Sequence, residues 1–302
     1  MTDGPTRSRH AKDGDRSRDR ERPPAPDPLP HPVVDNHCHL DIADGPDGSW
    51  LPTEDALRMA TEVGVPRIVQ IGCDLPGARW AVDAANAHDQ IVAGVALHPN
   101  EAPRLAEEDR LDGAMAEIER LALDPRVRAV GETGLDYFRT GDEGRAAQHD
   151  SFRRHIELAR ALDKTLVIHD RDAHADVVRI IDEVGAPDRW VMHCFSGDAE
   201  FAGECLDRGA YLSFAGTVTF KNAEPLRDAL KLTPQDRILV ETDAPYLTPM
   251  PHRGRPNASY LVPLTMRSMA TTLGVDLEEL CRSVDRNTDR AFGGTWGSPR
   301  TS

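Results

Sequence analysis

The chain has 302 residues, with 36 Lys and Arg against 51 Asp and Glu, and a formal net charge of −15. Its length fits one large α/β barrel or two modest domains, and its 39% of hydrophobic residues excludes a chain that is disordered throughout. No stretch comes near the roughly 18 consecutive apolar residues of a membrane span, so we expect no membrane partner. The acidic balance argues against loose binding to a polyanion, because nucleic acids attract proteins through clustered Lys and Arg.

The N-terminal segment differs in composition from the rest of the chain. Its first 30 residues contain almost no apolar side chains and mix seven basic with six acidic groups. Such a segment cannot bury enough surface to offset its ordering entropy. We therefore predict a disordered tail over residues 1–32 and a single domain over residues 33–295.

The cysteines and the absence of an export signal indicate a reduced, cytoplasmic protein. The five cysteines form no CxxC pair and are odd in number. Cys38, Cys73 and Cys194 lie in or at the end of apolar runs, where a reduced cysteine behaves as a small hydrophobic residue. A cytosolic location follows from this usage.

From residue 33 onward, short β-rich runs alternate with stretches of helical periodicity. The runs cover residues 33–40, 67–73, 91–98, 127–134, 165–170, 189–195, 210–216 and 237–243. The stretches between them, such as 53–64, 112–124, 145–163 and 173–185, have apolar residues three and four positions apart. Strands that alternate with helices imply right-handed crossovers and a parallel sheet.

Eight such units in about 260 residues are typical of a (β/α)8 TIM barrel, the fold that we predict. A doubly wound open sheet is the alternative, but the first strand–helix turn lacks a Gly-rich phosphate loop. Polar and ionisable residues gather at the C-terminal ends of the runs. Barrels of this type keep their active sites at that end, so this pattern favours the barrel.

The strand ends carry a set of metal-ligand side chains. In chain order these are His37, His39, Glu132, His169, His193 and Asp243. The spacing of two in His37-x-His39 places both imidazoles on one face of a strand. In a closed barrel the other ends converge on the same mouth.

Four imidazoles and two carboxylates exceed what one catalytic metal ion takes from a protein, so we predict two divalent ions with one shared carboxylate. This mixed N/O set fits Mg²⁺, Mn²⁺ or Zn²⁺ and does not choose among them. Taken singly, each histidine could be a hydrogen-bonded core residue and each carboxylate a cap or ion pair. Five strand ends that all carry such groups are better explained by a metal site, because buried ionisable groups are costly without partners.

Five sequence blocks identify a family. DNHCHLD (35–41), GETGLDYF with Arg139 (131–139), IHDRDA (168–173), HCFSG (193–197) and ETDAPYL (241–247) resemble the TatD-type metal-dependent deoxyribonucleases of the amidohydrolase superfamily. The resemblance runs from about residue 33 to residue 293. It implies a barrel with a binuclear metal centre and phosphodiester hydrolysis of DNA.

The resemblance also implies roles for the site residues. His37, His39 and Asp243 are similar to ligands of one metal ion, His169 and His193 to ligands of the other, and Glu132 to a ligand of both. Asp243 is similar to the superfamily's proton-accepting aspartate, which would activate the attacking water, so Asp243 and Glu132 are the predicted catalytic residues.

Candidate substrate contacts follow the mouth-facing motifs: His98, Arg139, Arg171, Arg253 and Arg255. Arginine matches phosphate oxygens with two hydrogen bonds, although each arginine could instead form a surface ion pair.

The expected partner is DNA, as single strands or ends, because the acidic domain would hold long duplex only weakly. Cleavage of the 3′–5′ exonuclease type is the main hypothesis. Hydrolysis of a carboxylic ester or amide, such as an aminoacyl-tRNA ester, is the alternative, and a non-catalytic metal-binding protein is a weaker one. Oligomeric state is not predicted.

Overall fold

A computed structural model of the chain describes residues 4–8, 21–44 and 50–297. Eight parallel strands form its main sheet, in the order β10-β9-β8-β7-β6-β5-β4-β2. These strands are β2 (Val34–Cys38), β4 (Arg67–Gly72), β5 (Ile91–Val95), β6 (Val127–Asp136), β7 (Thr165–Arg171), β8 (Trp190–Met192), β9 (Tyr211–Phe214) and β10 (Ile238–Val240). Each falls within or overlaps one of the eight predicted runs, which confirms the strand prediction.

The first and last strands of the sheet meet through the segment that follows β10. The Asp243 N–H donates to the His37 carbonyl at 3.0 Å, and the His39 N–H donates to the Ala244 carbonyl at 2.8 Å. Cys38 and Ala244 form a parallel bridge at the same place. The sheet is therefore a nearly closed barrel, and the predicted TIM-barrel fold is confirmed.

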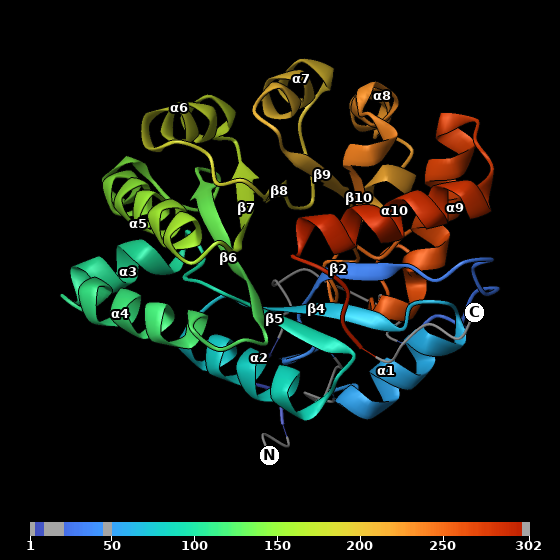
Figure 1. The fold of residues 1–302 in the computed structure, drawn as a ribbon, viewed down its shortest axis with the longest axis horizontal. Helices are drawn as coiled ribbons and strands as arrows, with labels where there is room; N and C mark the ends of the chain where they lie inside the picture. The colour runs from blue at the N-terminus through green and yellow to red at the C-terminus, as the bar shows by residue number, and fades with distance from the viewer. Residues whose placement is uncertain (1–3, 9–20, 45–49, 298–302) are drawn as a thin grey trace.

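Helices surround the strands (Figure 1). They are α1 (Thr53–Glu62), α2 (Leu75–Ala87), α3 (Glu101–Glu107), α4 (Leu111–Ala122), α5 (Asp142–Ala161), α6 (His174–Val184), α7 (Ala199–Asp207), α8 (Glu224–Leu232), α9 (Val262–Leu273) and α10 (Leu277–Ala291). Three 3₁₀ segments, η1 (Gly216–Thr219), η2 (Gln235–Arg237) and η3 (Ser259–Leu261), lie in the second half of the chain. None of the described helices is long and apolar enough to span a membrane.

The barrel interior has its own apolar core. Val69, Val92 and Val167 from three strands share one buried cluster with Phe292 and Trp296, which follow α10. The Trp296 indole N–H donates to the Gln90 carbonyl, just before β5 begins. These C-terminal aromatic residues therefore cover the N-terminal end of the barrel, which leaves the opposite end for the site.

The N-terminal segment departs from the prediction of a disordered tail over residues 1–32. The Tyr260 hydroxyl donates to the Pro23 carbonyl at 2.6 Å, and the Leu29 N–H donates to the Val63 carbonyl at 3.0 Å. Leu29 is buried in the main core. A short strand, β1 (Arg7–Ser8), pairs in parallel with β3 (Ile42–Ala43).

Residues 21–32 order against the barrel because their backbone carbonyls find donors and their prolines lose little conformational freedom on folding. The prediction of disorder used the small number of apolar side chains alone. Composition of that kind reveals neither the backbone hydrogen bonds nor the low entropy cost of the prolines. The rest of the predicted tail, residues 1–3 and 9–20, lies outside the described residues.

Glycine permits the close approach of β6 and β7 that brings two site residues together. Gly134 has φ +132° and pairs with His169. A Cβ at this position would lie 2.1 Å from the His169 carbonyl oxygen. The β6–β7 register shifts between Val130 and Thr133, the stretch that contains Glu132. Both Glu132 and His169 thus owe their positions to this irregular pairing.

We expect Gly134→Ala to lower the free energy of unfolding by more than about 1 kcal/mol, because the new methyl group meets backbone and the φ value is strained. Gly113→Ala on α4 is the matched control, since nothing lies within 4 Å of a Cβ there. It should stabilise the protein by about 0.5–1 kcal/mol through helix propensity. Urea unfolding measures both, and equal stabilities of the two variants would contradict the argument.

Candidate metal centre

The structure brings the six predicted ligands to one mouth of the barrel. His37 belongs to β2 and His39 follows it, Glu132 belongs to β6, His169 belongs to β7, His193 follows β8, and Asp243 lies three residues after β10. The side chains of His169 and Asp243 are 17% and 15% exposed, and the other four are 5% exposed or less. The cluster is therefore buried but reachable from solvent at two of its members.

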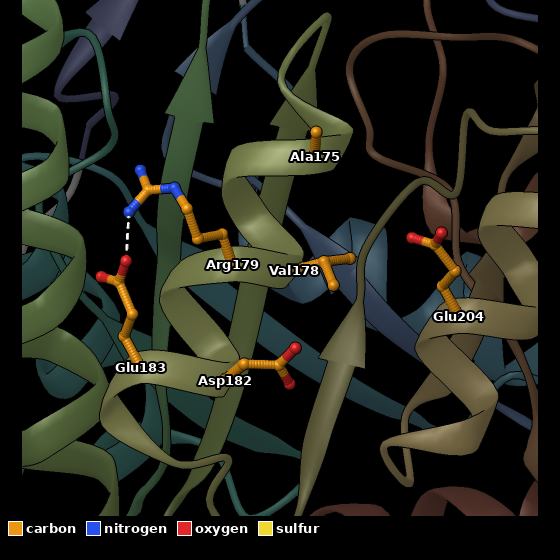
Figure 2. Close-up of a pocket in the computed structure, with 6 residues that line it drawn as sticks. All are labelled: Ala175, Val178, Arg179, Asp182, Glu183 and Glu204. Atoms are coloured by element: carbon orange, nitrogen blue, oxygen red, sulfur yellow. Dashed lines mark hydrogen bonds and ion pairs between the residues drawn. The ribbon is translucent and has the colours of Figure 1, made fainter.

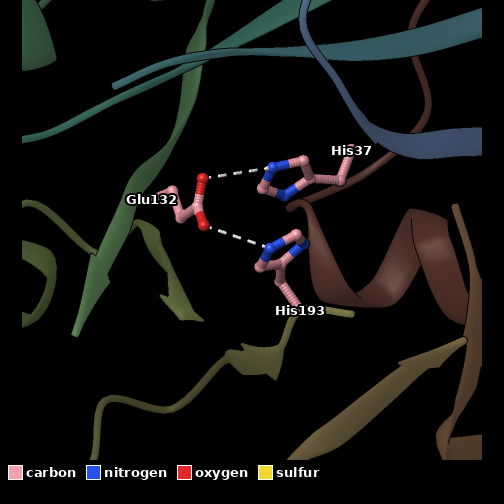
Figure 3. Close-up of side chains that lie close together, drawn as sticks. All are labelled: His37, Glu132 and His193. Carbon is pink, nitrogen blue, oxygen red and sulfur yellow. Dashed lines mark ion pairs between the residues drawn. The ribbon is translucent and has the colours of Figure 1, made fainter. Parts of the chain in front are cut away.

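Glu132 separates the imidazoles into two groups. Its Oε2 lies 3.6 Å from His37 Nε2 and 4.0 Å from His39 Nε2. Its Oε1 lies 2.7 Å from His169 Nδ1 and 3.1 Å from His193 Nε2. Figure 3 shows the two oxygens directed at His37 and His193 from opposite corners of the carboxylate. One carboxylate thus faces two sets of ligand atoms.

Asp243 completes the first group. Its Oδ1 lies 3.3 Å from His39 Nε2 and 3.9 Å from His37 Nε2. Its backbone has φ +54°, and its N–H is fixed by the His37 carbonyl. The strand closure that completes the barrel therefore also positions this carboxylate over the two histidines.

The donor set fits divalent cations. The described residues form four groups in which each residue places one ligand atom within 4.8 Å of the others. They are His37, Glu132 and His193; His37, His39 and Asp243; His39, Cys73 and Glu132; and His98, Glu132 and His169. Both ring nitrogens of the fully buried His37 lack a hydrogen bond. A cation would satisfy a buried nitrogen of this kind, which otherwise costs free energy.

The acidic and basic groups of the cluster shift one another's pKa values toward their charged forms. Burial alone would raise the pKa of Glu132, but the charges of His193 and His98 and the hydrogen bonds from His169 and His193 outweigh it and hold the pKa well below its usual value. Burial lowers the pKa of His169, but Asp136 and Glu132 outweigh this effect and raise it to about 9. Glu132 is thus an ionised buried carboxylate that needs positive neighbours.

Sequence comparison now decides the family. The model of a family described as "TatD related DNase" matches residues 34–293. The chain belongs to the TatD family. It is 42% identical over 268 residues to an uncharacterised metal-dependent hydrolase TatD of Mycobacterium tuberculosis, covering 87% of this chain and 99% of that protein. It is 41% identical over 261 residues to the uncharacterised metal-dependent hydrolase YcfH of Escherichia coli K12, covering 86% of this chain and 95% of that protein.

Solved structures agree on the fold of this TatD-family hydrolase. The E. coli TatD homologue YjjV superimposes with a TM-score of 0.77 and 24% identity over 87% of this chain and 98% of that one. A TatD-family hydrolase from Entamoeba histolytica superimposes with a TM-score of 0.76 and 21% identity, over 88% of this chain and 100% of that one. These structures have the same TIM-barrel fold, and the sequence relatives make the chain a metal-dependent hydrolase of the TatD family.

A second layer of polar groups orients the TatD-family cluster. Glu241 Oε1 lies 2.8 Å from His193 Nδ1, and the Ser213 hydroxyl donates to Glu241 Oε2 at 2.5 Å. Asn36 donates to both the Ser213 hydroxyl and the Val240 carbonyl. The buried chain from Asn36 to His193 fixes the ring so that Nε2 faces Glu132, as outer partners of metal-binding histidines commonly do.

The predicted substrate contacts separate into two sets. His98 joins the cluster, with Nε2 3.5 Å from Glu132 Oε1 and a side chain 14% exposed. Arg139, Arg171 and Arg253 are exposed, and Arg255 is half-buried. The Arg171 guanidinium lies 4.0 Å above the Phe138 ring, and that of Arg253 lies 4.3 Å above the Phe220 ring. Within the described part of the chain, Arg171 and Arg253 thus rest on aromatic rings rather than on the six clustered side chains.

Sequence reasoning missed several residues at this mouth. Cys73, after β4, lies 3.3 Å from Glu132 Oε2. Asp41 pairs with Arg7 at 3.9 Å and accepts a 2.5 Å hydrogen bond from the Thr6 hydroxyl. Cys73 and Asp41 follow strands, so the strand-end rule that selected the histidines could have found them. Arg7 comes from the predicted tail, and no sequence signal placed it here.

A hollow of about 540 Å³ on the helical layer is separate from this site. It is lined by Ala175, Val178, Arg179, Asp182, Glu183 and Glu204, on or beside α6 and α7 (Figure 2). None of these residues belongs to the clustered set, and Arg179 and Glu183 pair with each other along α6. The clustered ligand-type side chains, and not this hollow, therefore indicate the functional end of the barrel.

Proposed function

We propose that this TatD-family protein is a divalent-metal-dependent deoxyribonuclease that removes nucleotides from the 3′ ends of single-stranded DNA. The observation that supports it is the position of Glu132, whose two oxygens face separate groups of histidines. In this proposal His37, His39 and Asp243 hold one cation, His169 and His193 hold a second, and Glu132 serves both. Two divalent cations would lower the pKa of a water and neutralise charge on a phosphodiester.

The chain's own residues supply the remaining chemistry. Asp243 accepts the proton of the attacking water, because it is a carboxylate beside both histidines of the first group with its side chain open to the mouth. Burial would raise the pKa of Asp243, but the His39 hydrogen bond and the charges of His193, His39 and His37 lower it. The carboxylate is therefore ionised and ready to accept a proton at neutral pH.

Substrate positioning falls to His98 and the loop arginines. His98 has its Nδ1 fixed by the Asn100 N–H at 3.1 Å, which leaves Nε2 directed at the cluster. Arg139, Arg171, Arg253 and Arg255 contact the phosphates of the strand beyond the scissile bond. With a net charge of −15 the protein repels long duplex DNA, so short strands or ends that reach the cations are its substrates. A cytoplasmic location is part of the proposal, since all five cysteines are free.

Metal removal tests the proposal directly. Chelator-treated protein should release nucleotides from a 3′-labelled single-stranded oligonucleotide at least about 100-fold more slowly than the loaded protein, because both activation of water and charge neutralisation are lost. Separate additions of Mg²⁺, Mn²⁺ and Zn²⁺ to the treated protein should restore the rate with at least one ion. A 5′-labelled strand assayed in parallel reports the polarity of cleavage.

An aminoacyl ester assayed beside the oligonucleotide tests the alternative activity. The alternative rests on the same cluster, because an activated water can attack a carboxylic ester as well as a phosphodiester. Metal-dependent ester hydrolysis without nucleotide release would overturn the nuclease proposal in favour of the esterase.

A further inference from the structure

Cys73 lies inside the cluster that the proposed function treats as the metal centre. It directly follows β4 and is buried, with 3% exposure. Its Sγ lies 3.3 Å from Glu132 Oε2 and 3.8 Å from His39 Nδ1. Cys73, His39 and Glu132 form a candidate ligand group of their own, and Cys73 is the one cysteine in any such group of the described residues.

The same oxygen of Glu132 also faces a histidine with no hydrogen bond. His37 Nε2 lies 3.6 Å from Oε2 and is fully buried. Two ligands bound to Zn²⁺ at about 2.1 and 2.3 Å, at the tetrahedral angle, lie roughly 3.5 Å apart. The Cys73–Glu132 and His37–Glu132 separations both match this span. Sulfur and imidazole thus lie around one carboxylate oxygen as ligands of a single cation would.

The neighbouring histidine is oriented for the same role. His39 Nδ1 is 2.9 Å from the Ile71 carbonyl, so Nδ1 carries the proton and donates it there. Its Nε2 is left to face Asp243 and Glu132. A ring fixed in this way by a backbone carbonyl is typical of metal-binding histidines.

We propose that Cys73 is a further ligand of the cation that His37, His39, Asp243 and Glu132 hold, and that its sulfur makes this position prefer Zn²⁺ to Mg²⁺. The inference rests on the metal centre of the proposed function. Coordination forms a sulfur–metal bond and releases the thiol proton to solvent. Thiolate is a soft ligand that selects Zn²⁺, whereas Mg²⁺ takes oxygen ligands and retains its waters.

Cobalt substitution of the full-length protein tests the inference without relying on activity. Co²⁺ added to chelator-treated protein should give sulfur-to-cobalt charge-transfer absorption in the near ultraviolet, together with the visible bands of bound Co²⁺. The wild-type spectrum is informative even if a variant fails to fold. Cys73→Ser should lose the charge-transfer absorption and keep visible bands, and its Zn²⁺ affinity should fall at least about tenfold while its Mg²⁺ affinity changes less.

Cys205→Ser is the matched control. Cys205 is a buried cysteine on α7 outside every candidate ligand group of the described residues, and its replacement should leave the spectrum unchanged. Visible bands without charge transfer in the wild type would overturn the role of Cys73 and leave the metal centre standing. Absence of Co²⁺ binding would overturn both. Charge transfer that survives Cys73→Ser would assign the sulfur to another cysteine and overturn the inference.

Discussion

Glu132→Gln is expected to remove most of the protein's divalent-cation binding and to slow metal-dependent nucleotide release more than about 100-fold. Loss of an outer partner of a metal site costs up to about 100-fold, and a ligand shared by both cations should cost more. The carboxylate presents one oxygen to His37 and His39 and the other to His169 and His193. Glutamine keeps one acceptor oxygen and replaces the other with a donor NH₂ group. It can therefore serve only one of the two groups, and it removes the negative charge that both need.

Two measurements separate this effect from misfolding. Metal bound per chain, determined by elemental analysis after dialysis, should fall in Glu132→Gln, while the urea unfolding midpoint of the variant shows whether it remains folded. Glu132→Asp keeps the charge but shortens the reach, so we expect intermediate metal binding from it. Glu117→Gln on α4 is the control, since this carboxylate pairs with the exposed Arg79 and Arg120 and belongs to no candidate ligand group of the described residues. Full metal content and full rate in Glu132→Gln would contradict the shared-ligand role.

The strands and the cluster could be predicted because both follow from local pattern. A parallel barrel strand buries both faces, so polar residues in its run stand out at the end where the chain leaves the barrel. His169 and His193 could be selected by this rule alone, and the structure brings both to Glu132. The rule also reached Cys73, but apolar neighbours led us to interpret it as a small hydrophobic residue.

Other features depend on contacts that no local pattern reveals. The two Glu132 oxygens face different histidines because of the register shift of β6 against β7. This shift is a property of the paired strands. The order of residues 21–32 depends on donors far along the chain, such as the Tyr260 hydroxyl that reaches Pro23. The predicted arginines lie at or beyond strand ends, yet Arg171 and Arg253 rest on aromatic rings rather than on the cluster. Long exposed side chains have too many rotamers for their position in sequence to fix where they point.

Asp243→Asn should lower the rate of nucleotide release by about 10²- to 10⁴-fold, the contribution of a general base, while the fold is retained. Asparagine has nearly the same shape and tolerates the φ of +54° found here. The backbone hydrogen bond from residue 243 to the His37 carbonyl does not involve the side chain and would persist. What the variant loses is the negative charge beside His39 and the ability to accept a proton.

The measurement is the rate on a 3′-labelled oligonucleotide as the metal concentration is raised to saturation. Asp243 is proposed both to hold a cation and to accept a proton, and these roles respond differently. If it served only as a ligand, excess metal would refill the weakened site and restore the rate. Because it also accepts the proton of the attacking water, the variant should stay slow at saturating metal. Asp236→Asn, an exposed change before the N-terminal end of β10, should match the wild type. Recovery of the full wild-type rate by Asp243→Asn at high metal would show that proton acceptance belongs to another group.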